Sequence, residues 1–453
     1  MIAVIILAGG RGTRMKSSVP KVLHKLTGQT LIESVIKAAQ SIMPKQVIVV
    51  GSECLFTNNE WINIRNRYYA KTNDDSINVV TKTPITEVLQ SDPLGTAHAV
   101  QAAFAVIQQE VNQVIILHAD VPLIQTRTLR ELSISKCDLT LASTQIINPS
   151  SSSYGRVILD DDGIPLAIRE AKELTEKQKG VDIVNAAIYS ISRKCLKACL
   201  FDIQNDNTAK EFYFTDIVNI AYSRGFSISH IKISQDEAFG INTQDDLINA
   251  PVQRILKEKM TTNGVIMQDP SSIVFSIDTQ IESGSTISAF NVFGPNVNIG
   301  ANVVVHAFCV LSDCTISDWS EIGPFAHIHK ESVICSNAMI GNFVEVKKST
   351  IGEQTKAKHL SYLGDAALGK KVNIGAGTVV CNYDGFRKHQ TIIRDNASIG
   401  ANSSLVAPLD IGSNAFVGAG STITMDVPDE TLALSRSKQI HNLEWVRKKC
   451  LKK

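Results

Sequence analysis

The chain has 453 residues, in which 45 Lys and Arg residues nearly balance 44 Asp and Glu residues, and 44% of the residues are apolar. This length exceeds what one ordinary core accommodates, so two or three domains are expected. The apolar content and the net charge of +1 exclude an intrinsically disordered chain and a surface that binds nucleic acid as a whole.

The first apolar run, residues 1–8, ends at Gly9 after far fewer than the roughly 18 residues that a membrane helix needs, and no basic segment precedes it. We therefore expect a cytoplasmic protein without a membrane partner. The nine cysteines are scattered and form no close pair of Cys-x-x-Cys motifs, which favours reduced thiols over a disulfide framework or a structural zinc site.

Short apolar runs alternate with amphipathic stretches from residue 1 to about residue 245. The strand-like runs are 2–7, 46–50, 114–117 and 139–147, and the helical stretches include 30–43 and 96–110. Continuous apolar strands between helices predict a Rossmann-like α/β domain over 1–245, with a mostly parallel sheet covered on both faces. The stretch 245–260 reads as one helix, so we place a linker helix at 246–262.

Beyond this linker a large apolar residue, usually Ile, Val or Leu, recurs every six positions. The register slips by one residue at three places and is interrupted once, between Val380 and Ile393, and a small residue often follows the apolar one. This period is typical of a left-handed parallel β-helix of hexapeptide repeats, which we place at 263–453, with the insertion 381–392 projecting from its side and a basic C-terminal tail. A β-sandwich with Ile-Gly turns is the weaker alternative. The repeated positions are Ile281, Ile287, Phe293, Ile299, Val305, Leu311, Ile316, Ile322, Ile328, Ile334, Ile340, Val346, Ile351, Leu363, Leu368, Ile374, Val380, Ile393, Ile399, Leu405, Ile411, Val417 and Ile423.

A glycine-rich segment, 9–12, follows the first predicted strand, with Arg14 and Lys21 nearby. Glycines at such a turn let backbone N–H groups approach phosphate oxygens, and a triphosphate needs fixed cations. Met15 replaces the third glycine of a dinucleotide fingerprint, and a Walker-type ending is absent from the sequence. The segment therefore indicates a phosphate site or a tight turn, and the two cations favour the former.

Asp120 comes just after the predicted strand 114–117, at the edge of a parallel sheet where ligands bind. A carboxylate there can bind Mg²⁺, which prefers oxygen ligands, or it can cap the next helix. Spacing alone leaves both readings open.

Six segments together resemble the sugar-nucleotide pyrophosphorylases, and most closely their bacterial bifunctional branch, in which one chain carries a uridyltransferase and an acetyltransferase. The segments are 7–14, 20–23, 94–99, 119–122, 154–156 and 212–216, and the hexapeptide array with its insertion is similar to the second half of that family. The resemblance spans almost the whole chain, in order.

This resemblance implies a Mg²⁺-dependent transfer of UMP from UTP to N-acetylglucosamine-1-phosphate. The sugar phosphate is already an anion, so alignment and charge neutralisation replace a general base. Lys21 and Arg14 are the implied catalytic cations, and Asp120 and Asn242 the implied metal ligands, although Asn242 alone would read as an Asx turn or helix cap. The residues implied to bind UTP or UDP-N-acetylglucosamine are Leu7, Ala8, Gly9, Gly10, Lys21, Gln90, Gly95, Thr96, His118, Ala119, Asp120, Gly155, Glu170, Asn185 and Asn242.

In the repeat half, the resemblance implies that His359 is the base of an acetyl transfer from acetyl-CoA to glucosamine-1-phosphate. Imidazole suits this task, whereas a lone His on a repeat protein is usually just solvated. The implied glucosamine-1-phosphate contacts are His329, Lys347, Tyr362 and Asn373, and the implied acetyl-CoA contacts are Ala376, Asn382, Tyr383, Ala401, Ala419 and Arg436. The family forms homotrimers that share each acetyl site between coils, so a homotrimer is expected.

The chain departs from the family pattern at 323–330, where Gly-Pro-Phe-Ala-His-Ile-His-Lys stands in place of the usual Gly-Pro-Phe-Ala-Arg-x-Arg-Pro. His329 replaces a phosphate-binding arginine and offers no bidentate fork of donors. Ala401 stands where a serine is usual near CoA, and Ala186 and Ala187 replace Thr-Gly after the sugar-binding Asn. The resemblance is therefore weakest at the acetyl site.

The main hypothesis is a bifunctional enzyme that makes UDP-N-acetylglucosamine, a precursor for peptidoglycan and lipopolysaccharide, from small-molecule substrates. The alternative is a single-activity sugar-nucleotide pyrophosphorylase with a hexapeptide oligomerisation domain, but such relatives lack the combination of His359, Tyr362, the insertion and Arg436. A catalytically dead scaffold is a third reading, and it would be expected to lose Lys21, Asp120 or His359.

Overall fold

The computed structural model describes residues 1–10, 12–69, 83–147, 149 and 152–450. The chain divides into two compact units, Met1–Val252 and Gln253–Lys453, and each is described by itself.

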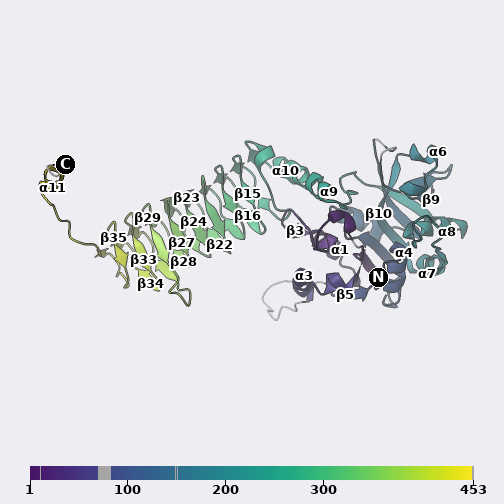
Figure 1. Ribbon diagram of the computed structural model, residues 1–453, viewed down its shortest axis with the longest axis horizontal. Coiled ribbons are helices and arrows are strands. Elements are labelled where there is room, and N and C mark those ends of the chain that lie inside the picture. The colour runs from purple at the N-terminus through teal and green to yellow at the C-terminus, as the bar shows by residue number, and fades with distance from the viewer. Residues whose placement is uncertain (11, 70–82, 148, 150–151, 451–453) are drawn as a thin grey trace. The chain divides into compact units, whose positions relative to one another are not determined.

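A mixed, mostly parallel sheet forms the middle layer of the first unit (Figure 1). Its centre consists of the parallel strands β1 (Ile2–Leu7), β4 (Gln46–Gly51) and β6 (Gln113–His118). The order is β11-β7-β10-β6-β1-β4-β5, in which β10 runs antiparallel to both of its neighbours in this order. The remaining strands are β5 (Ile85–Leu89), β7 (Leu139–Gln145), β10 (Ile183–Ser192), β11 (Ile228–Lys232) and the attached hairpin of β8 (Arg156–Leu159) and β9 (Pro165–Arg169).

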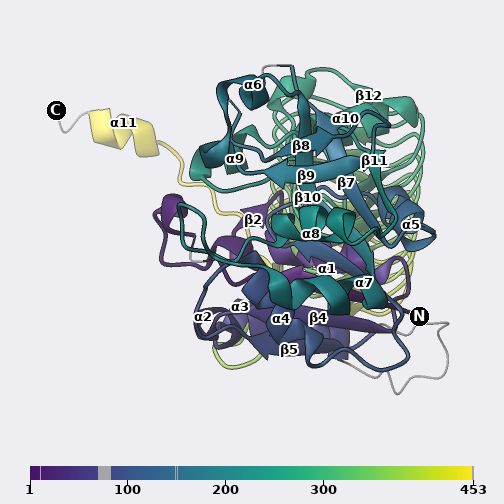
Figure 2. The same ribbon diagram turned by 90° about the vertical axis from the view of Figure 1, so that its right-hand side faces the viewer.

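Helices cover both faces of this sheet (Figure 2). Alternate side chains of β1 point to opposite faces, so Ala3 and Ile5 pack in one core while Val4 and Ile6 pack in the other. Burial on both sides explains why the strands read as continuous apolar runs. One face is covered by α4 (Thr96–Phe104), α7 (Arg193–Cys199) and α8 (Ile217–Ser223), and the other by α1 (Leu31–Gln40), α3 (Asn59–Tyr69) and α5 (Thr126–Ser133).

The short elements of this unit lie in its connections. They are η1 (Thr13–Met15), η2 (Lys21–Leu23), β2 (Lys25–Leu26), β3 (Gln29–Thr30), α2 (Glu53–Phe56), η4 (Ala171–Glu173), α6 (Glu176–Lys179), η5 (Leu200–Asp202) and η6 (Phe214–Asp216). The predicted strands are confirmed at 2–7, 46–50 and 114–117, whereas the strand predicted to reach residue 147 ends at Gln145. Both predicted helices are present but shorter than expected.

The single helix predicted over 245–260 is wrong, because two helices occupy this stretch. They are α9 (Gln244–Asn249) and α10 (Val252–Thr262), and the break falls at Ala250 and Pro251. Proline lacks the backbone N–H that a helix interior needs and disfavours helical backbone in the residue before it. Ala250 accordingly leaves the helical region, with ψ of 133°.

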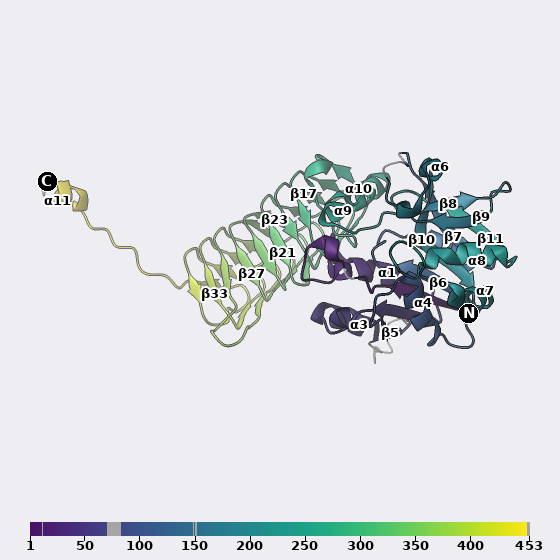
Figure 3. The same cartoon turned by 45° about the vertical axis from the view of Figure 1, so that its right-hand side comes forward.

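The second unit is a parallel β-helix whose short strands form three sheets in residues 253–450, all of which are described (Figure 3). The first sheet contains β12 (Ile266–Met267), β14 (Thr286–Ile287), β17 (Val304–Val305), β20 (Glu321–Ile322), β23 (Met339–Asn342), β26 (Lys356–His359), β29 (Asn373–Ile374), β32 (Ser398–Ile399), β35 (Phe416–Val417) and β37 (Leu432–Ala433). The second contains β13 (Gln280–Ile281), β16 (Val297–Ile299), β19 (Cys314–Ile316), β22 (Ser332–Ile334), β25 (Thr350–Ile351), β28 (Ala366–Leu368), β31 (Thr391–Ile393) and β34 (Leu409–Ile411). The third contains β15 (Val292–Phe293), β18 (Val310–Leu311), β21 (His327–His329), β24 (Glu345–Lys347), β27 (Tyr362–Gly364), β30 (Val379–Cys381), β33 (Ser404–Val406) and β36 (Thr422–Ile423).

The interior of the coil is filled by the residues that the six-residue period predicts. Every one of them is buried, from Ile281 to Ile423. The period had left a gap between Ile351 and Leu363, and Ala357, which is also buried, fills it. A small side chain at an inward position therefore hid one repeat from a pattern based on large aliphatic residues.

Glycines at the corners allow successive coils to stack closely. A Cβ at Gly341 would overlap the carbonyl oxygen of Lys358, and one at Gly352 would overlap that of Gly369. The strand pairs on either side stay in register, as between Ile340 and Ala357. The predicted insertion lies between β30 and β31 and carries a short bridge between Tyr383 and Lys388.

The second unit begins with α10 and a one-turn helix, η7 (Pro270–Ser272), and it ends with a short helix, α11 (Trp445–Cys450). Residues 451–453, the end of the predicted basic tail, lie outside the described residues. Within the described part of the chain, none of the helices has the length and apolar character that a membrane crossing requires.

Candidate functional site

A cavity of about 750 Å³ opens in the first unit at the carboxyl ends of β1 and β6 and the start of α4. This is the edge of a parallel sheet at which ligands of such folds bind. The structure brings together here most of the residues predicted for the nucleotide, namely Leu7, Ala8, Gly9, Gly10, Arg14, Lys21, Gln90, Gly95, Thr96, His118 and Asp120.

Two glycines shape the wall of this cavity. A Cβ at Gly9 would overlap the side-chain oxygen of Gln90, so any larger residue here would displace that side chain. Gly95 has φ of 127°, which disfavours residues with a side chain, and a Cβ there would overlap the backbone of Phe212. The start of α4 is tied to the same segment, since the backbone N–H of Phe214 donates to the Thr96 hydroxyl at 2.8 Å.

Four polar side chains meet beside the cavity, although three separate segments of the chain supply them. Lys21 Nζ donates to Asp120 Oδ2 and, at 3.0 Å, to Asn242 Oδ1. Arg14 Nη2 donates to the same Asn242 oxygen at 2.9 Å. The side chains of Lys21 and Asp120 are 11% and 21% exposed, so their ion pair is largely withdrawn from water.

The electrostatics of this cluster favour an ionised carboxylate. Burial by itself raises the pKa of Asp120, but the charges of Lys21 and His118 and the hydrogen bond from Lys21 outweigh it, and the pKa lies below its ordinary value. Burial also lowers the pKa of His118, more than the neighbouring Asp120 raises it. An anionic Asp120 beside a neutral imidazole is therefore the stable state at neutral pH.

The donor set fits a divalent cation of the magnesium class. Asp120 and Asn242 offer a carboxylate and an amide oxygen, the types of ligand that Mg²⁺ takes from proteins. Both oxygens already converge on one cation, the Lys21 ammonium. These two oxygens are therefore placed to hold positive charge.

The predicted sugar contacts form a second group, which lies outside the residues that line the cavity. The backbone N–H of Asn185 donates to the Gly155 carbonyl at 2.9 Å, and a Cβ at Gly155 would lie 3.6 Å from Glu170 Oε2. Glu170 accepts a hydrogen bond from the Thr215 hydroxyl at 3.1 Å. Burial, and to a lesser extent nearby carboxylates, raises the pKa of Glu170.

Several placements differ from what sequence reasoning indicated. Ala119 is fully buried and does not line the cavity, and its backbone N–H donates to the Leu7 carbonyl at 3.0 Å. Asp92, Lys210 and Glu211 line the cavity and had not been singled out. Lys210 and Glu211 directly precede the recognised segment 212–216, so that segment was the signal that could have found them.

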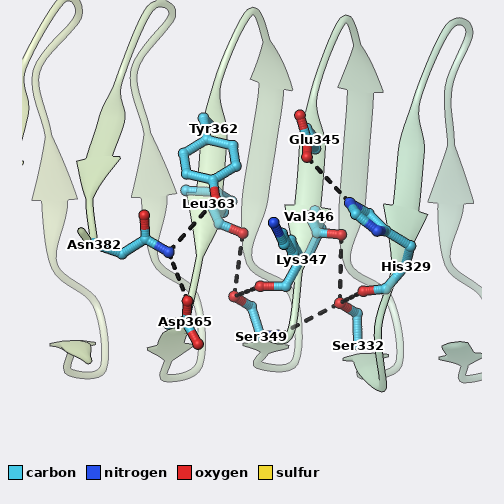
Figure 4. A network of polar contacts seen from close by, with 10 residues as sticks. All are labelled: His329, Ser332, Glu345, Val346, Lys347, Ser349, Tyr362, Leu363, Asp365 and Asn382. Carbon is cyan, nitrogen blue, oxygen red and sulfur yellow. Dashed lines mark hydrogen bonds and ion pairs between the residues drawn. The ribbon is translucent and has the colours of Figure 1, made fainter. Parts of the chain in front are cut away.

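In the second unit, one outer face of the β-helix carries most of the residues predicted for glucosamine-1-phosphate (Figure 4). His329 of β21 lies opposite Lys347 of β24, and Glu345 lies opposite Tyr362 of β27. His329 Nε2 is 3.1 Å from Glu345 Oε1. Asn373 differs, because it begins β29 on the neighbouring face and is exposed there.

The predicted base, His359, ends β26 one corner away from Tyr362 and is exposed. Its Nδ1 lies 2.9 Å from Asn342 Oδ1. An amide oxygen can only accept, so this contact places the proton on Nδ1 and leaves the lone pair on Nε2. That tautomer is the one a general base needs when Nε2 faces the substrate.

The residues predicted for acetyl-CoA divide into two groups. Ala376, Ala401 and Ala419 occupy equivalent corners of successive coils, where backbone N–H groups of Asn402 and Gly420 donate to Ala376 and Ala401. Arg436 Nη1 donates to the Ala419 carbonyl at 3.0 Å, at the end of this row. Asn382 is instead buried, with its amide 2.6 Å from Asp365 Oδ2, and Tyr383 lies exposed in the insertion.

Comparisons with known proteins agree with both halves. Residues 4–145 match the model of the MobA-like NTP transferase domain, and residues 390–424 match that of the bacterial transferase hexapeptide (six repeats). The chain is 40% identical to the bifunctional protein GlmU of Ruthia magnifica subsp. Calyptogena magnifica, covering 98% of each chain. It is 37% identical to the proteins of the same name from Bartonella quintana (98% of this chain and 96% of the other) and Thermotoga maritima (98% of each). The chain therefore belongs to the GlmU family of bifunctional proteins.

Proposed function

We propose that this chain is a bifunctional enzyme of UDP-N-acetylglucosamine synthesis. The second unit transfers the acetyl group of acetyl-CoA to glucosamine-1-phosphate, and the first unit joins the product to UMP from UTP with release of pyrophosphate. The observation that carries the proposal is the meeting of Lys21, Asp120 and Asn242 beside the cavity that the glycine-rich turn lines. The functional boundary falls at 246–262, the region of α9 and α10.

In the first unit the residues bind and align two anions. Arg14 and Lys21 hold the phosphates of UTP, while Gly9 and Gly95 leave room for the nucleotide against the backbone. Glu170 and Asn185 contact the acetylated sugar, so its phosphate oxygen faces the α-phosphate. The transfer is metal-dependent; Asp120 and Asn242 would hold Mg²⁺, which would supply neutralisation of phosphate charge. Alignment and charge neutralisation suffice, since the attacking oxygen is already ionised.

In the second unit His359 acts as the general base. Asn342 holds the imidazole with Nε2 free, and Nε2 takes the proton of the amine as its nitrogen attacks the thioester carbonyl. The carbon–sulfur bond then breaks, the protonated imidazole returns its proton to the sulfur, and CoA leaves as the thiol. Lys347 and Tyr362 bind the sugar phosphate from the neighbouring strands, and Arg436 pairs with phosphates of CoA.

A homotrimer is part of the proposal, because the exposed insertion and C-terminal arm of one coil are suited to complete a site on another coil. The mass of the native assembly in solution measures this directly. A monomer with full acetyl-transfer activity would contradict it.

One incubation tests both activities at once. Glucosamine-1-phosphate, acetyl-CoA, UTP and Mg²⁺ are supplied, and free thiol and pyrophosphate are followed separately. We expect thiol first and pyrophosphate after a lag, because the second reaction consumes the product of the first. Pyrophosphate release that requires added N-acetylglucosamine-1-phosphate would show that the acetyl site is silent.

A further inference from the structure

Two imidazoles and a carboxylate meet on the outer face of β21 and β24. Inward Ile328 alternates with outward His327 and His329, and Glu345 lies opposite His327 on the next strand. The two imidazole rings are stacked, with centroids 4.2 Å apart, and His329 Nε2 is 3.1 Å from Glu345 Oε1. One possible ligand atom from each of the three residues lies within 4.8 Å of the other two.

We propose that His327, His329 and Glu345 form a binding site for a divalent transition-metal ion of the zinc class. Zn²⁺ takes imidazole and carboxylate ligands at about 2.0–2.2 Å, and a set of three protein ligands leaves a coordination position open. Atoms bound to one tetrahedral Zn²⁺ lie about 3.4 Å apart, so closure needs shifts of about 1 Å in side chains at the surface of the coil. The fixed strands supply the rest of the geometry.

The alternative is that His329 and Glu345 only form a hydrogen-bonded pair. Another His–Glu pair on the same β-helix shows what such a pair looks like. His306 Nε2 lies 2.7 Å from Glu321 Oε1, also on the outer surface, but this pair has no second imidazole beside it. Among the described residues, His327, His329 and Glu345 form the one group of at least three His, Cys, Asp or Glu residues whose ligand atoms come close enough to share an ion.

The open coordination position points to an anion as the further ligand. Glu345 neutralises one charge of a divalent ion, and Lys347 adds a positive charge directly opposite His329 (Figure 4). With the ion bound, this surface would carry a net positive charge, although positions 327 and 329 are histidines and not the arginines usual in the family. A phosphate oxygen is a suitable fourth ligand. The metal ion would then bind the phosphate of glucosamine-1-phosphate, an assignment that rests on the proposed acetyl transfer.

Metal binding is tested first, without any assay of activity. The full chain is freed of metal with a chelator and titrated with Zn²⁺ against a chromophoric competitor, in parallel with His327→Gln and the control His306→Gln. The wild-type chain and the control should bind one Zn²⁺ more per chain than His327→Gln, or bind it at least about tenfold more tightly. Circular dichroism checks that each variant is folded, and equal Zn²⁺ binding by all three proteins would overturn the site.

The role of the anion is tested by the Michaelis constant for glucosamine-1-phosphate, measured from thiol release with and without one equivalent of Zn²⁺. Zn²⁺ should lower this constant severalfold in the wild type and in His306→Gln, and leave it unchanged in His327→Gln. If Zn²⁺ does not change the Michaelis constant of the wild type, the proposed role of the ion in phosphate binding is wrong. An absence of thiol release in every protein would contradict the proposed acetyl transfer instead, while the titration would still decide the metal site.

Discussion

At the scale of single residues, Lys21 shows how one side chain serves two partners. It holds the oxygens of Asp120 and Asn242 together, and it lines the cavity proposed for UTP. In the proposed function Lys21 contributes a positive charge at the reacting phosphates, so its loss should reduce uridylyl transfer.

We expect Lys21→Ala to lower kcat/KM for pyrophosphate release by about 100-fold or more, the order found for one buried electrostatic donor. Thiol release by the second unit should be unchanged, since Lys21 belongs to the first unit. Lys37→Ala, at an exposed position of α1, is the control for loss of a lysine. Near-normal pyrophosphate release by Lys21→Ala would rule out its proposed role.

Glu170 presents the opposite case, a carboxyl group that is costly to ionise. Burial raises its pKa above the ordinary value of 4.5 for a glutamate. The folded chain therefore holds this proton more tightly than the unfolded chain, and ionisation of Glu170 lowers stability as the pH rises through and above that value. Such a cost is understandable if the carboxylate contacts the sugar.

The prediction concerns Glu170→Gln, which removes the ionisation and keeps the shape. The free energy of unfolding of the variant, relative to the wild type, should increase between about pH 4.5 and about pH 8, as measured by urea denaturation. Uridylyl transfer should fall in the same variant. A stability difference that is the same at both pH values would show that Glu170 does not carry this cost.

At the scale of elements, the period of the sequence predicted most of the β-helix, because each inward side chain is set by one position in six. The failures have physical causes that can be named. Ala357 is inward but too small for a pattern of large aliphatic residues, and Pro251 breaks a stretch whose apolar spacing is otherwise helical. The pattern near Asp120 left a metal ligand and a helix cap as equal readings. Spacing also could not bring Asn242, or Asn342 beside His359, to their partners. Those contacts depend on tertiary structure, and only the family resemblance predicted a functional role for Asn242.

Stacking of the coils gives a test at this scale. Gly341→Ala places a methyl group on the carbonyl oxygen of Lys358, so we expect the free energy of unfolding to fall by about 1–3 kcal/mol, as for an overpacked core. Gly180→Ala is the control, since its nearest contact would be 3.7 Å away and its φ is −79°. Scanning calorimetry of the full chain compares the two, and an equal effect of both substitutions would mean that the close approach at Gly341 is not needed.

At the scale of the whole molecule, the residues proposed for each reaction lie in one unit. The uridylyl-transfer residues belong to the first unit, and the proposed base and phosphate contacts of the acetyl transfer belong to the second. In the proposed sequence N-acetylglucosamine-1-phosphate links the two reactions, and we expect it to be released between them. A chain that lacks one activity should therefore still serve a chain that lacks the other.

The prediction is made for a mixture of Lys21→Ala and His359→Ala chains. Neither variant alone should convert glucosamine-1-phosphate, acetyl-CoA and UTP to UDP-N-acetylglucosamine, because the first stops after acetylation and the second before it. The mixture should form the nucleotide sugar after a lag, since the acetylated sugar released by one chain reaches the cavity of the other. Dilution should lengthen the lag if the intermediate diffuses, and added N-acetylglucosamine-1-phosphate should abolish it. If the mixture makes no product while each variant keeps its remaining activity, the intermediate passes between sites without release, and the two units act as one catalyst.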